Sequence, residues 1–122
     1  MKFIIDMKLD NWNNIIGRCR SNKIGANTHK QKEMKYLSYY MMGLPKIKNY
    51  PIEMTFTWHI KSLLSDLDNK SIKSILDEMQ ILGILENDNI KCINKITHIA
   101  VNDKKEYVEI EIKENNINGL EK

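Results

Sequence analysis

Residues 52–60 read Ile52-Glu53-Met54-Thr55-Phe56-Thr57-Trp58-His59-Ile60, which is the clearest strand pattern in the chain. Apolar and polar side chains alternate along all of it, which is the pattern of a β-strand that buries one face and leaves the other open. Other elements must pack on the buried face, and the segments before and after this strand in the sequence predict them.

On the C-terminal side, apolar residues recur at helical spacing over residues 69–82, and Gly83 follows as a helix stop. Residues 90–101 predict a strand that can contain a bulge, residues 102–105 a turn, and residues 107–112 a last strand. The polar tail over residues 114–122 is expected to fray.

On the N-terminal side, alternation over residues 2–8 predicts a strand, and helical spacing over residues 9–19 predicts a helix. A second helix is expected over residues 28–44, where Gly43 and Pro45 end it. The element order is therefore β-α-α-β-α-β-β. We expect one α+β domain over residues 1–122, with a single small sheet and helices packed on it.

The composition excludes several classes of protein. Of the 122 residues, 42% are hydrophobic and 29% are charged, a balance that argues against disorder. No apolar run is long enough for a transmembrane helix, so no membrane association is expected. Cys19 and Cys92 form no CxxC pair and the three histidines form no cluster, so a zinc site is not expected. Asp6 comes too early for a signal peptide, and the expected setting is the reducing cytoplasm.

Charge is unevenly distributed along the chain. Residues 1–60 carry ten basic and four acidic side chains, whereas residues 61–122 carry nine basic and twelve acidic ones. A basic region beside an acidic one suits a nucleic-acid enzyme, because cations hold phosphates and carboxylates hold a metal. A surface of ordinary solvated lysines has the same composition, so charge alone leaves both interpretations open.

Carboxylates flank the helix predicted over residues 69–82. Asp66-Leu67-Asp68-Asn69 precedes it, and Asp88 comes shortly before the next strand. In extended backbone Asp66 and Asp68 point the same way, and Asp88 returns near them if the flanking strands pair. Three converging carboxylates repel one another unless a cation lies between them, and oxygen ligands suit Mg²⁺ or Mn²⁺. The alternative is that these residues only cap the helix and form a turn.

A longer series carries a family resemblance. The stretches Asp66-Leu67-Asp68-Asn69, Ile72-Lys73-Ser74-Ile75-Leu76-Asp77, Gly83 and Asn87-Asp88, in this order, resemble the core of the RusA-type Holliday junction resolvases. The resemblance covers residues 52–112 well and residues 9–45 more weakly. It implies Mg²⁺-dependent hydrolysis of phosphodiesters in branched DNA (four-way junctions) by a homodimer acting in recombination and repair, without a small-molecule cofactor. The alternative is a non-catalytic relative that binds branched DNA or another partner.

The resemblance also implies roles for single residues. Asp66, Asp68 and Asp88 would be the catalytic, metal-binding carboxylates, and Asn69 would order the first pair or cap the helix. Lys73 would stabilise charge on the scissile phosphate. It follows Asp68 by five residues where the family commonly has four, so Lys70 is the alternative. The residues expected to contact DNA phosphates are Arg18, Arg20, Lys23, Lys30, Lys61 and Lys70.

Overall fold

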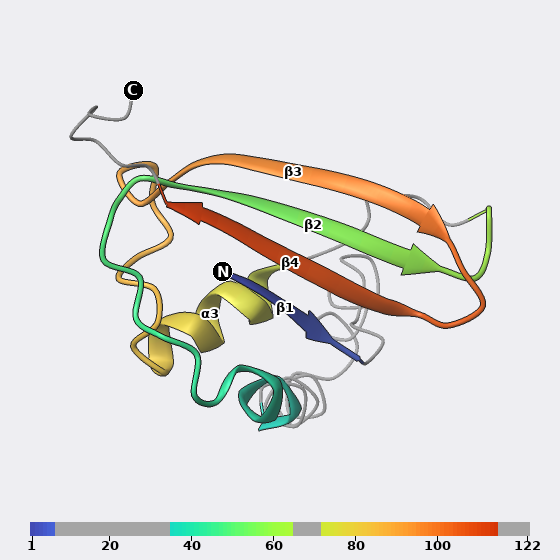
Figure 1. Cartoon of the computed structure of the whole chain (residues 1–122), viewed down its shortest axis with the longest axis horizontal. Coiled ribbons are helices and arrows are strands. Elements are labelled where there is room, and N and C mark those ends of the chain that lie inside the picture. Colours follow the sequence, from blue (N-terminus) through green and yellow to red (C-terminus); the bar gives the residue numbers. More distant parts are fainter. Residues whose placement is uncertain (7–34, 65–71, 115–122) are drawn as a thin grey trace, which may run out of the picture.

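The structure, a computed structural model, describes residues 1–6, 35–64 and 72–114. These residues form one four-stranded sheet and two helical segments (Figure 1). The strands are β1 (Lys2–Ile5), β2 (Ile52–Ile60), β3 (Ile93–Asn102) and β4 (Tyr107–Glu114). Helix α3 spans Lys73–Ile81, and residues 35–41 are also helical. The described part of the chain is therefore an α+β fold, as the sequence predicts.

The sheet is mixed, with the strand order β1-β4-β2-β3. β2 pairs with β3 in parallel and with β4 antiparallel, and β4 pairs antiparallel with β1. Parallel neighbours need a crossover connection, and α3 lies within the connection from β2 to β3. The two antiparallel pairs, β2 with β4 and β4 with β1, join strands that are not consecutive in the chain.

One face of the sheet holds the core. Every second residue of β2 is buried, from Ile52 to Ile60, and the side chain of Phe56 is fully buried at the centre. Leu37 from the helical segment 35–41 and Ile75 from α3 are also fully buried in the same cluster. Both helical segments therefore cover the same face of the sheet (Figure 1). Burying a side chain of this size contributes about 1.5–3 kcal/mol.

The opposite face of the sheet carries polar and charged side chains. Along β2 these are Glu53, Thr55, Thr57 and His59, all half-buried between the neighbouring strands. The pairing register adds charged neighbours from the other three strands. They are Lys2 of β1, Lys95 of β3, and Glu109, Glu111 and Lys113 of β4. We call this surface the open face.

Several predicted boundaries are confirmed. β2 spans residues 52–60 as expected. Gly43 and Gly83 end the two helical segments with φ angles of 87° and 76°, the left-handed conformation that glycine adopts without steric cost. The expected bulge is present as well, because Ile52 pairs with Ile93 whereas Glu53 pairs with Lys95.

Other boundaries differ from the prediction. β3 begins at Ile93 instead of residue 90, because the N–H groups of Cys92 and Ile93 both donate to the carbonyl oxygen of Asn89 and close a turn there. The first strand ends at Ile5. The expected helix over residues 9–19, the start of the one over 28–44 and the tail after residue 114 lie outside the described residues. Neither helical segment of the described part is long and apolar enough to cross a membrane.

Candidate functional site

Asp88 lies in the turn between α3 and β3. Its side chain is exposed, and its backbone N–H donates to Asn87 Oδ1 at 2.7 Å. A second contact fixes the loop, because the N–H of Glu86 donates to the hydroxyl of Tyr50 at 2.8 Å. The Asp88 carboxylate is thus held on an anchored loop and presents oxygen atoms to solvent, which suits a hard cation such as Mg²⁺.

Lys73 is the first residue of α3. Its Nζ lies 3.8 Å from Asp77 Oδ2, one helical turn further on, and its side chain is 60% exposed. The preceding residue, Ile72, packs against the core. Because neighbouring helical positions are about 100° apart, Lys73 stands at the border between the buried and solvent sides of α3.

The remaining carboxylates of the predicted metal site are Asp66 and Asp68, which lie with Asn69 and Lys70 in residues 65–71, outside the described residues. The pairing of β2 with β3 that their convergence requires is present. The two strands run parallel, however, with the starts of β2 and β3 at the same end (Figure 1). Asp88, which precedes β3, is therefore near the start of β2, whereas Lys61 follows its opposite end. Convergence therefore depends on residues 65–71, and the three-carboxylate site stays a prediction.

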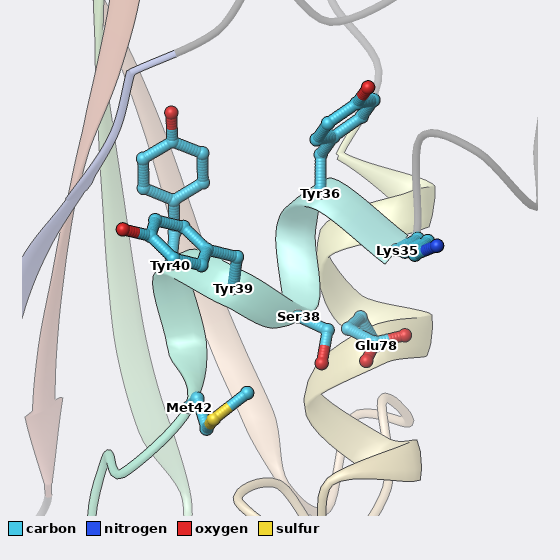
Figure 2. A pocket seen from close by; sticks show the side chains of 7 residues that line it. All are labelled: Lys35, Tyr36, Ser38, Tyr39, Tyr40, Met42 and Glu78. Atoms are coloured by element: carbon cyan, nitrogen blue, oxygen red, sulfur yellow. The ribbon is translucent and has the colours of Figure 1, made fainter.

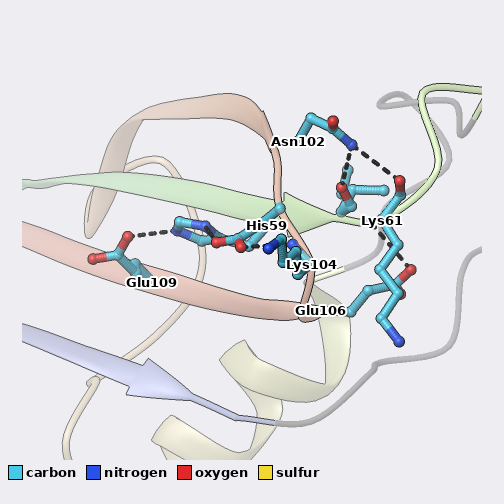
Figure 3. A network of polar contacts seen from close by, with 8 residues as sticks. His59, Lys61, Asn102, Lys104, Glu106 and Glu109 are labelled. Atoms are coloured by element: carbon cyan, nitrogen blue, oxygen red, sulfur yellow. Dashed lines mark hydrogen bonds and ion pairs between the residues drawn. The ribbon is translucent and has the colours of Figure 1, made fainter.

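Lys61, the described member of the predicted DNA contacts, follows the last residue of β2. The Asn102 side-chain amide donates to the carbonyl oxygens of Ile60 and Lys61, both at 3.0 Å, and the Lys61 N–H lies 3.4 Å from Glu106 Oε2 (Figure 3). These contacts hold the backbone, whereas the lysine side chain extends away from the strand. Arg18, Arg20, Lys23 and Lys30 lie outside the described residues.

A histidine between two carboxylates occupies the open face. His59 Nδ1 lies 3.0 Å from Asp103 Oδ2, and Nε2 lies 2.6 Å from Glu109 Oε1 (Figure 3). The ring stacks on Tyr107 with a centroid distance of 3.9 Å. Carboxylates only accept hydrogen bonds, so the imidazole serves both of them when it carries two protons. The pKa of Asp103 is lowered, chiefly by the backbone N–H of Lys104 and then by His59.

The sequence pattern does not indicate this cluster. The alternation of β2 places His59 on the polar side of the strand, but its partners come from residues 44 and 50 positions later in the chain. The pairing of β2 with β3 and with β4 brings them together, since Asp103 directly follows β3 and Glu109 belongs to β4. Because both ring nitrogens already have partners, the cluster acts as a polar cross-link between the strands.

A second histidine, His98, lies on the core side of β3. The indole N–H of Trp58 donates to its Nδ1 at 2.9 Å, and the ring stacks with Phe56 and Trp58. Trp58 is thus a core residue, as its place in the alternation predicts. Burial lowers the pKa of His98, and the indole contact requires a neutral imidazole.

This arrangement predicts a pH-dependent stability. The folded pKa of His98 lies below the unfolded value of about 6.5, so on acidification the unfolded state takes up the proton first. The free energy of unfolding should therefore fall as pH drops from above to below about 6.5, by at most about 1.4 kcal/mol per pH unit for one proton. Urea unfolding at pH 7.5 and 5.5 measures it. His98→Gln should show a smaller drop, and an equal drop in both proteins would contradict the assignment.

An open groove of about 790 Å³ lies where the helical segment 35–41 meets α3 (Figure 2). Tyr36, Tyr39 and Met42 line it and are largely exposed. Glu78 of α3 faces Ser38 at its inner wall and is buried. Burial raises the pKa of Glu78, and a hydrogen bond with the Ser38 side chain partly opposes that effect. The groove offers aromatic and sulfur surface, without a cluster of charged ligands.

No protein-family model matches the chain, and no curated protein matches it. Within residues 1–6, 35–64 and 72–114, no three His, Cys, Asp or Glu side chains are grouped to hold a metal ion. Two of the three predicted metal ligands, Asp66 and Asp68, are not among those residues.

Proposed function

We propose that this protein is a Mg²⁺-dependent, structure-selective endonuclease of the RusA type that cuts four-way DNA junctions as a homodimer. One observation carries the proposal: the motif residues follow the strand–helix–strand unit β2–α3–β3 in the order of that family. Asp66 and Asp68 come between β2 and α3, Lys73 opens α3, and Asp88 precedes β3.

The residues have chemistry that suits this reaction. Asp66, Asp68 and Asp88 would hold the ion through carboxylate oxygens, and the exposed carboxylate of Asp88 fits such a role. The bound ion would supply charge that draws a phosphate oxygen and a water molecule together. The ammonium of Lys73 would stabilise negative charge that develops on the phosphate. A four-way junction has two-fold symmetry, so paired cuts suit a two-fold symmetric dimer.

A direct assay tests the proposal. The purified protein is incubated with a synthetic four-way junction and, separately, with a linear duplex of the same sequence, each with Mg²⁺ or with EDTA. Symmetric nicks in the junction alone, and only with Mg²⁺, are the expected result. Tight junction binding without any cleavage would favour the non-catalytic alternative, and neither binding nor cleavage would contradict both.

Phosphate contacts by the basic segment give a further prediction. Arg18, Arg20 and Lys23 lie in a segment with few acids, and each phosphate they neutralise should add about 0.9 to the slope of log affinity against log salt. Replacing all three by alanine should flatten the slope for junction binding. The control variant, Lys2→Ala with Lys113→Ala, removes charge from the open face and should keep the slope. Equal slopes for the wild type and the first variant would show that the segment does not contact DNA.

A further inference from the structure

β3 is a long edge strand. All of its ten residues except Asn94, at the bulge, pair with β2, and the described part of the chain provides no strand on its other side. Ile96, Ile99 and Val101 are 42%, 44% and 37% exposed. The other edge is formed by β1, which has only four residues. Natural sheets usually protect long edges with proline, several charges or a bulge, because an unprotected edge accepts another strand.

β3 has little of this protection. It contains no proline, its bulge lies at its first residues, and Lys95 is its sole lysine, arginine or acidic residue. From Ile96 to Asn102 the strand is neutral apart from His98, whose ring is stacked on the core side. The exposed edge therefore has the composition of a strand that is paired on both sides.

The backbone shows which peptide groups point outward. The N–H of Asp103 donates to the carbonyl oxygen of Ile60 at 2.9 Å, so this residue directs its peptide groups toward β2. Along a strand these directions alternate, so Lys95, Thr97, Ile99 and Val101 also face β2. The even-numbered residues from Ile96 to Asn102 therefore direct their N–H and C=O groups away from the sheet.

We propose that β3 is the dimer interface, pairing antiparallel with β3 of a second copy about a two-fold axis at Ile99. In antiparallel pairing, residues whose peptide groups point away from β2 must lie opposite residues of the same kind in the partner strand. Because these residues alternate along β3, the two-fold axis must pass through a residue and not between two residues. With the axis at Ile99, Lys95 lies opposite the partner's Asp103, and the same pair recurs on the other side. The Asp103 carboxylate would accept this contact in addition to those with His59 and the Lys104 N–H. This charge complementarity selects both the second copy as occupant and the register.

The proposed pairing satisfies the exposed groups of β3. Ile99 meets its own symmetry mate, and Thr97 meets the partner's Val101. His98 lies opposite the partner's Ala100, and Ile96 lies opposite the partner's Asn102, so about eight backbone hydrogen bonds form. The two four-stranded sheets become one continuous sheet.

The β3 interface rests on the proposed function, because that function includes a homodimer. Its test is independent, because oligomeric state is measured without DNA or metal. A protein that dimerises through β3 but does not cut junctions would contradict the nuclease alone. A protein that cuts junctions but dimerises elsewhere would contradict the interface alone.

Sedimentation velocity tests the interface. The wild type should sediment at twice the chain mass of 14.4 kDa. Ile99→Lys sets two ammonium groups against each other at the axis and should raise the dimer dissociation constant more than about tenfold. The control Ile4→Lys changes an isoleucine of β1 that is 48% exposed on the same open face, and should leave the dimer intact. A monomeric wild type, or a dimer that Ile99→Lys leaves unchanged, would overturn the proposal.

Cysteine cross-linking tests the register and does not depend on the stability of the charged variant. The native cysteines are first replaced (Cys19→Ser and Cys92→Ala). Ile99→Cys should then form an intermolecular disulfide under mild oxidation, because the Cα atoms of two opposed residues lie at a distance that a disulfide can span. Thr97→Cys should not, since the two copies of position 97 are offset by four residues, about 13 Å along the strand. Cross-linking at position 97 but not 99, or at neither, would refute this register.

Discussion

Asp68→Asn is expected to abolish junction cleavage while leaving the fold and junction binding intact. Asparagine keeps the size of the side chain but removes the negative charge that holds a divalent cation. Losing several kcal/mol of transition-state stabilisation corresponds to a rate loss on the order of 10³-fold or more. Single-turnover cleavage of a labelled four-way junction measures the rate, and a gel-shift assay with Ca²⁺ in place of Mg²⁺ measures binding.

The matched control is Glu111→Gln, which makes the same type of change at an exposed carboxylate of β4 on the open face. It should cut at the wild-type rate. Asp88→Asn should resemble Asp68→Asn if both residues hold the ion. Wild-type cleavage by Asp68→Asn would show that the motif is a helix cap and a turn, the alternative that the sequence leaves open.

Lys73→Ala should lower the cleavage rate by roughly 10²–10³, the usual loss for one preorganised group that stabilises developing charge. Metal affinity should stay equal or rise, because a nearby cation is removed. The fold should tolerate the change, since the exposed ion pair with Asp77 is worth only about 0.2–0.5 kcal/mol. Cleavage rates at saturating protein, with Mg²⁺ titrated, separate the two effects.

Two controls make this prediction specific. Asp77→Asn removes the same ion pair but keeps the lysine, and should cut at close to the wild-type rate. Lys70→Ala tests the alternative position. If Lys70→Ala carries the loss and Lys73→Ala is silent, the extra residue between Asp68 and Lys73 has turned Lys73 away from the phosphate. The position of Lys73 beside Ile72, at the border of the core, favours Lys73, because its aliphatic stem can lie along apolar surface.

The elements that the sequence predicts well are those whose pattern is complete within the element. The alternation of residues 52–60 defines both the strand and its buried face, and Gly83 marks the end of α3. The sequence pattern of β3 is less regular, because this edge strand has exposed isoleucines on both faces of the sheet. It starts later than its sequence pattern predicts, because a turn around Asn89 includes the first apolar residue, Ile90.

The strand order and the polar clusters could not be predicted, because they depend on register between distant segments. Nothing local to His59 indicates that Asp103 and Glu109 will flank its ring. The direction of β3 also depends on its pairing with a distant segment, and it determines where Asp88 lies. Pairing alone suggests that Asp88 returns to the end where β2 finishes, whereas parallel pairing leaves it at the start of β2. The site residues Asp66 and Asp68 remain predictions from the motif.

The pairing of β1 with β4 has a consequence for the order in which the chain is made. Lys2 pairs with Glu111, so the first strand leaves the ribosome more than a hundred residues before its partner. In contrast, β2, α3 and β3 emerge together and can pair locally. β1 has only four residues, and it gains its contacts only after the long chain segment between β1 and β4 has brought these two strands together. We therefore expect β1 to complete the sheet last during synthesis, after β4 has docked on β2.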